Sequence, residues 1–172
     1  MVRRMKIPIP LAVLTVLALA LGACSGGEKT EAAKDVARFL DAVRRGDRQT
    51  FDAGLNRPEI RADLREQVKE LARLKGVEVD GGPSEFAMDR MIAPEAFHLV
   101  DARTGQPLAA GPTPAQVAAM LKVRNATRVC LDDATTHACR ITFAKRDGGW
   151  KLVGMPATDL RIEVPPPVAA KP

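Results

Sequence analysis

Apolar residues recur at helical spacing through the first half of the chain, and residues that cap helices lie between the apolar segments. The pattern predicts a helix over residues 30–46, begun by the N-cap Thr30, and a short helical turn after Asp47. The clearest helix is predicted over residues 56–76, where Asn56 and Glu59 form a variant of the capping box. The expected buried residues of these helices are Val36, Phe39, Leu40, Val43, Phe51, Leu55, Ile60, Leu64, Val68, Leu71 and Leu74.

The pattern is weaker in the middle of the chain. Residues 84–100 are interpreted as two short helical pieces that Pro94 separates, and another short helix is predicted to begin at Thr113-Pro114. The side chains that these pieces offer for burial are Phe86, Met88, Met91, Phe97 and Leu99, then Val117, Met120 and Leu121.

After Lys122 the apolar period changes from helical to alternating. Strands are predicted over residues 127–131, 138–145 and 150–155, with Asp147-Gly148-Gly149 as the turn of the last hairpin, and residues 160–164 could add an edge strand. Three prolines, residues 165–167, would end the fold because they cannot donate to a ladder. The predicted class is therefore α+β, a single domain over residues 30–164 with N-terminal helices packed on a C-terminal antiparallel sheet.

The N-terminus has the pattern of an export signal. Basic residues precede an apolar run over residues 11–21, which is too short to span a bilayer and fits the apolar core of a signal peptide. The following Leu21-Gly22-Ala23-Cys24 resembles the cleavage and acylation site of bacterial lipoproteins. The alternatives are an ordinary signal peptide cut after Ala23, with Cys24 as a free thiol, and an uncleaved membrane helix.

The lipoprotein resemblance implies that residues 1–23 are removed and that Cys24 carries a diacylglyceryl group and a further acyl chain. Two such chains anchor a protein stably. Ser25 stands where aspartate usually signals retention in the inner membrane, so the resemblance favours the outer membrane, facing the periplasm. We expect residues 24–29 to form a lipidated tether that spans less than about 20 Å, and residues 165–172 to form a flexible tail.

Charge and aromatic content argue against a nucleic-acid partner. Of the 26 Lys and Arg residues, three lie before residue 7, so the mature chain carries 23 basic against 21 acidic residues, a net charge of only +2. The chain has five Phe, one Trp and no Tyr, too few to suggest a surface on which bases stack.

With Cys24 assigned to lipid, Cys130 and Cys139 remain as a pair. A hairpin centred between Ala134 and Thr135 would place them directly opposite on neighbouring strands, within disulfide reach. A metal set of Cys130, His137 and Cys139 is the alternative, but it lacks a fourth ligand.

No catalytic motif is present elsewhere, and we expect no enzymatic activity, metal or cofactor. His98, within an apolar segment, is interpreted as a core or edge residue rather than a catalytic base. No nucleophile elbow, phosphate loop or dinucleotide fingerprint occurs in the sequence.

Two stretches resemble an uncharacterised bacterial family, domain of unknown function 2939. They are residues 41–68, with Arg44-Arg45-Gly46-Asp47 and the run from Arg57 to Gln67, and residues 141–156, with Asp147-Gly148-Gly149-Trp150. The resemblance covers most of residues 32–156, loosely between 77 and 110, and the family favours Ser where this chain has Asp63. It implies a cystatin-like or NTF2-like fold and no particular activity.

A basic row, Arg57, Arg61, Arg65, Lys69 and Arg73, recurs at every fourth residue of the long predicted helix. Like charges at this spacing repel one another, and Glu66 and Glu70 neighbour only the later members. One interpretation is a solvated face whose arginine stems cover apolar surface. The other is that the row binds anionic headgroups or an acidic partner near the membrane.

Two classes of function remain. The first is a lipid-anchored envelope protein that acts as a non-enzymatic binding or structural accessory module, in contact with the membrane and with a protein or amphiphile. The second is an NTF2-like protein with an apolar small-molecule pocket between helices and sheet, conceivably an enzyme. A pocket containing His98 or an Asp of raised pKa would favour the second class, and a filled core would favour the first.

Overall fold

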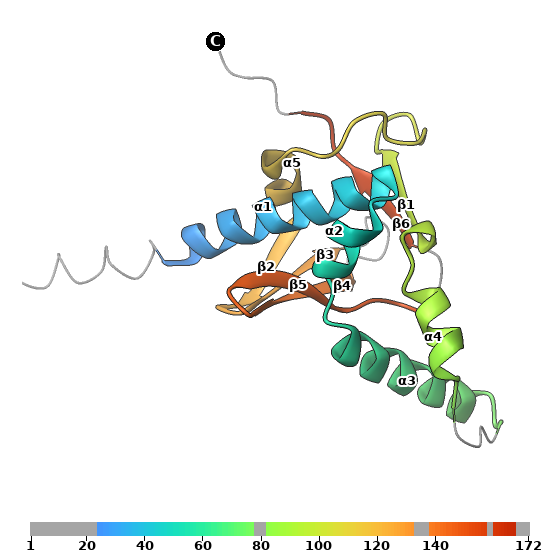
Figure 1. Ribbon diagram of the computed structural model, residues 1–172. Coiled ribbons are helices and arrows are strands. Elements are labelled where there is room, and N and C mark those ends of the chain that lie inside the picture. Colours follow the sequence, from blue (N-terminus) through green and yellow to red (C-terminus); the bar gives the residue numbers. More distant parts are fainter. Residues whose placement is uncertain (1–23, 78–81, 133–137, 158–159, 168–172) are drawn as a thin grey trace, which may run out of the picture.

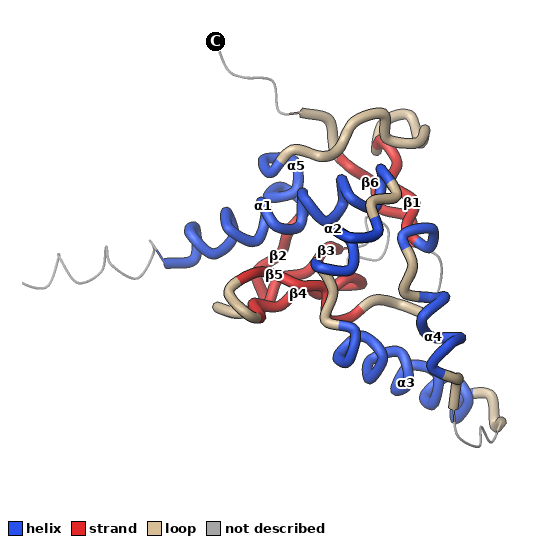
Figure 2. The backbone as a smooth tube through the Cα atoms, viewed as in Figure 1, coloured by secondary structure: helices blue, strands red, loops and turns tan. Residues whose placement is uncertain are grey.

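The computed structural model describes residues 24–77, 82–132, 138–157 and 160–167. The described chain is α+β, with most of its helices before residue 121 and most of its strands after it (Figures 1 and 2). In chain order the elements are α1 (Cys24–Arg45), α2 (Arg48–Ala53), α3 (Arg57–Leu74), α4 (Glu85–Met91), the 3₁₀ helix η2 (Pro94–Ala96), β1 (Phe97–Asp101), α5 (Pro114–Met120), β2 (Leu121–Asn125), β3 (Arg128–Asp132), β4 (Cys139–Arg146), β5 (Gly149–Gly154) and β6 (Leu160–Val164).

The main sheet is antiparallel, with strand order β2-β3-β4-β5, and helices cover both of its faces. Lys145 of β4 forms an ion pair with Glu31 of α1, whereas the next residue, Arg146, forms one with Glu59 of α3. Because successive strand residues point to opposite faces, α1 and α3 lie on opposite sides of the sheet. Figure 1 shows the same arrangement.

The core lies mainly between α1 and the sheet and is built around four phenylalanines. Phe39 of α1 stacks on Phe51 of α2 with ring centroids 5.2 Å apart, and it meets Phe97 and Phe143 edge to face at 5.7 and 5.6 Å. All buried core residues of the described chain fall between Ala32 and Val164. The part of the chain that follows residue 23 therefore contains its own hydrophobic core.

The first helix begins at Cys24 and not after Thr30, so the expected tether over residues 24–29 is helical instead. Thr30 does not cap: its hydroxyl donates to the Gly26 carbonyl 2.8 Å away, four residues back, as inside a helix. Two predicted features that depend only on local sequence are confirmed. Asn56 caps α3 by accepting from the Glu59 amide, and the β4–β5 turn has positive φ at Asp147 and Gly148.

One strand was predicted as helix, and another was not predicted. Phe97–Asp101 forms β1, which pairs in parallel with β6, so residues 160–164 form a strand outside the main sheet. Leu121–Asn125 forms β2, the edge strand beside β3, where the prediction ended a helix. β1 depends on β6, which is distant in sequence, and β2 depends on its hairpin with β3. Such strand pairing overrides the local pattern of a short apolar segment.

Candidate binding surface

The basic row lies on the side of α3 that meets α2 and α4, and acids from those helices neutralise its first half. Asp89 of α4 accepts from Arg61 at 2.6 and 2.9 Å and lies 3.4 Å from Arg57, which also pairs with Asp52 of α2 at 2.5 Å. Glu85 of α4 forms ion pairs with both Arg61 and Arg65. The three arginines nearest the start of α3 are therefore all paired with acids of α2 or α4.

The second half of the row is paired locally or exposed. Arg73 bonds Glu70 one turn away at 2.6 Å, and the pKa of the Glu70 carboxyl is lowered chiefly by this hydrogen bond. Lys69 is exposed and forms no ion pair within the described residues. The first half of the row thus holds α4 along α3, so Arg57, Arg61 and Arg65 are not free cations, whereas Lys69 and Arg73 lie on a solvated face.

Beyond these ion pairs the apolar stripe of α3 is uncovered. Ile60 and Leu64 are fully buried, but Leu71 and Leu74, expected in the core, are 52% and 69% exposed. Val77 and Phe86, the latter at the start of α4, are also exposed, and the Arg90 guanidinium lies 5.9 Å from the Phe86 ring centroid. We call Leu71, Leu74, Val77 and Phe86 the apolar end of α3 and α4.

Figure 1 shows this end projecting from the body, on the side opposite to the start of α1. Leu71, Leu74 and Val77 follow one another at the end of α3, and exposed apolar side chains that form a contiguous patch are typical of interaction sites. The sequence places Leu71 and Leu74 on one helix face but gives no sign that the sheet ends before it reaches them.

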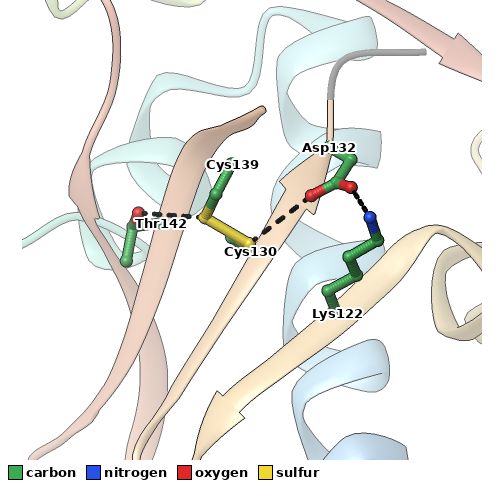
Figure 3. Close-up of a disulfide and its surroundings, with 5 residues drawn as sticks. All are labelled: Lys122, Cys130, Asp132, Cys139 and Thr142. Carbon is green, nitrogen blue, oxygen red and sulfur yellow. Dashed lines mark hydrogen bonds and ion pairs between the residues drawn. A yellow bond between two sulfur atoms is a disulfide. The ribbon is translucent and has the colours of Figure 1, made fainter. Parts of the chain in front are cut away.

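Cys130 and Cys139 form a disulfide with a Cα–Cα distance of 5.5 Å, as predicted, but they are not opposite residues (Figure 3). Cys130 pairs with Thr142 and Cys139 with Asp132, and the register shifts between Leu131 and Asp132. Asp132, beside the disulfide, forms an ion pair with Lys122 of the edge strand (Figure 3). The bond therefore ties β3 to β4 diagonally.

The remaining sequence candidates are not brought together. His98 is exposed on β1, opposite Arg161 of β6, which is an edge position rather than a core one. His137 lies outside the described residues, and Cys130 and Cys139 bond each other, so their thiolates are not free to bind a metal. The described residues contain no group of three His, Cys, Asp or Glu side chains placed to hold a metal.

Two hollows of the described surface are small and bordered in part by charged residues. One of about 310 Å³ lies between α1, α2 and the β4–β5 turn, where Asp35 accepts from the Trp150 amide at 2.9 Å. Another, of about 250 Å³, lies among the ion pairs of Arg57 and Arg61. Where described carboxyl pKa values depart from the ordinary range, hydrogen bonds lower them: from the Thr50 amide at Asp47, from Arg146 at Glu59 and from the Thr104 amide at Asp101.

Comparison of the chain with protein-family models, curated proteins and solved structures finds no match. The resemblance of residues 32–156 to domain of unknown function 2939, and the cystatin-like or NTF2-like fold that it implies, stay predictions. In the described part of the chain, no helix has the length and apolar character needed to cross a membrane.

Proposed function

We propose that this chain is a lipid-anchored protein of the bacterial cell envelope that acts as a non-enzymatic binding module. The observation that carries the proposal is the short apolar run that ends in Leu21-Gly22-Ala23-Cys24. The disulfide supports it in two ways. It fits an oxidising compartment, and it uses two of the three cysteines, which leaves Cys24 for the acyl chains. Ser25 after the cysteine favours the outer membrane, facing the periplasm.

The filled core supports a binding module rather than a pocket protein. An NTF2-like apolar site would need space between α1 and the sheet, and the rings of Phe39, Phe51, Phe97 and Phe143 occupy that region. The two hollows have several charged residues in their lining, whereas small-molecule sites are lined predominantly by apolar side chains.

The apolar end of α3 and α4 is the surface that we assign to a protein partner. Four large apolar side chains there face solvent, and the ion pairs of Arg61 with Asp89 and Glu85 hold α4 in place beside α3. Because this end lies opposite to the start of α1, a partner would reach it from the side away from the lipid.

Metabolic labelling with a clickable fatty acid tests the anchor. We expect the wild type to be labelled and Cys24→Ala to be unlabelled, because the cysteine thiol is the acylated atom. Equal labelling of the two proteins would contradict the proposal.

Photo-crosslinking in intact cells tests the binding surface. A crosslinking amino acid at Leu74 should form a discrete adduct, and the same amino acid at Arg103, also exposed, should not. Leu71→Ser should reduce the adduct at position 74. No adduct at Leu74, or equal adducts at both positions, would contradict a role for this end.

A further inference from the structure

Exposed cations lie at the β2–β3 turn, away from the projecting C-terminal end of α3. Arg124 at the end of β2 and Arg128 at the start of β3 flank the β2–β3 turn, residues 124–128, and both are exposed. Neither forms an ion pair within the described residues. The charge of Arg128 helps to lower the pKa of the Glu59 carboxyl, which forms an ion pair with Arg146. Because one carboxylate faces two guanidinium groups, one positive charge remains among these three side chains.

The local backbone directs Arg124 away from the ladder. Val123 pairs with Val129 and Asn125 with Arg128, so Arg124 is the extra residue of a β-bulge and has no partner in β3. Bulges turn a side chain out of the regular alternation of a strand. On an edge strand, the result is a guanidinium that faces solvent at the end of the sheet.

A chain of contacts connects this turn to the start of α1. The Lys145 amide donates to the Thr127 carbonyl at 2.9 Å, and the Lys145 ammonium bonds Glu31 of α1 at 3.1 Å. Glu31 follows Cys24 by seven helical residues, about 10 Å along the axis. Figure 1 shows the start of α1 and the β2–β3 and β4–β5 turns on the same side of the molecule.

We propose that the β2–β3 turn docks on anionic lipid headgroups of the membrane that holds Cys24, with Arg124 and Arg128 as the contacting cations. This inference rests on the proposed lipid anchor. Since α1 is helical from Cys24 onward, the lipid-bearing residue and the β2–β3 turn belong to one folded body and lie on the same side of it. In salt, charges act over about one Debye length, about 8–10 Å, so a turn that meets the membrane surface brings its arginines within reach of the headgroups. Anionic headgroups attract guanidinium groups at such distances. We do not assign the docking to the basic row of α3, because its first three arginines are ion-paired and its later members, Lys69 and Arg73, lie toward the far end of the helix.

The test uses residues 24–172 with Cys24→Ser, because this part contains its own core. Sedimentation with phosphatidylcholine vesicles, with or without one third phosphatidylglycerol, gives the partition coefficient. We expect binding only to the anionic vesicles, and weaker binding as salt increases. The pair Arg124→Gln and Arg128→Gln should lower the partition coefficient about 25-fold, roughly fivefold for each cation.

The matched control is Lys69→Gln with Lys75→Gln, which removes two exposed cations at the far end of α3 and should leave binding unchanged. Equal losses in both double variants, no binding to anionic vesicles, or binding that survives the loss of Arg124 and Arg128 would overturn the proposal; in the last case the two arginines only protect an edge strand. Because the tested protein lacks Cys24, these outcomes do not depend on whether the cysteine is acylated.

Discussion

Reduction of the Cys130–Cys139 disulfide should destabilise the domain by a predictable amount. The two cysteines are nine residues apart in sequence, and closing a loop of about ten residues restricts the unfolded chain by roughly 2.7 kcal/mol in the chain-entropy estimate. For a domain of this size, that loss corresponds to a decrease in Tm of about 5–10 °C.

The assay is thermal unfolding of oxidised and reduced wild-type domain, followed by circular dichroism at constant pH. The reduced protein keeps both sulfur atoms, so its packing is matched to that of the oxidised form. The double variant Cys130→Ala, Cys139→Ala should melt close to the reduced protein, lowered further by the small cavity at position 130. Identical melting of the oxidised and reduced forms would show that the disulfide does not stabilise the domain. Two free thiols in protein purified from the envelope would show that the disulfide does not form there.

Three further predictions concern single contacts. Gly27→Ala should stabilise the domain by up to about 0.5–1 kcal/mol in urea unfolding, because a Cβ there meets no atom within 4 Å and α1 is helical at that position; no change would favour a flexible tether. Glu59→Gln should lower the free energy of unfolding at neutral pH. Since Arg146 lowers the Glu59 pKa, the difference in stability between wild type and variant should be full above the ordinary carboxyl pKa and should vanish as the pH falls through the lowered one. A difference that stays constant down to pH 2 would contradict this. Asp89→Asn should speed amide hydrogen exchange in α4 more than in α1, because it weakens the bonds from Arg61; equal protection in wild type and variant would show that packing alone holds α4.

The features that the sequence predicted correctly are those in which neighbouring residues determine the structure. Asn56 and Glu59 determine the start of α3, Thr113 and Gln116 form the capping box of α5, and Asp147-Gly148 adopts the positive φ of a two-residue hairpin turn. The α+β class follows from the change of apolar period near residue 121.

The features that it missed depend on partners elsewhere in the chain. Phe97–Asp101 becomes a strand because Leu160–Val164 lies beside it, some 60 residues later. The partners of Arg57 and Arg61 are Asp52, Glu85 and Asp89, which come from two other helices, so a row that looks self-repelling in sequence is balanced in space. The apolar stripe of α3 likewise stays buried only as far as the sheet extends. It is exposed from Leu71 onward, and no sequence pattern marks this point.

The candidate sites also divide into those that depend on adjacent residues and those that depend on the folded chain. The sequence alone indicates Cys24 as the acylation site, because that pattern lies in four adjacent residues. It also pairs Cys130 with Cys139 correctly, although it assigns them the wrong register. The apolar end of α3 and α4 and the exposed β2–β3 turn could not be predicted, since each depends on what the folded chain leaves uncovered.

Mass spectrometry of the N-terminal peptide from protein purified out of its own membrane tests the lipid anchor most directly. We expect a peptide that begins at Cys24, lacks residues 1–23 and carries the added mass of a diacylglyceryl group and a further acyl chain. A peptide that begins at Cys24 with a free thiol, or one that still includes Leu21-Gly22-Ala23, would contradict it.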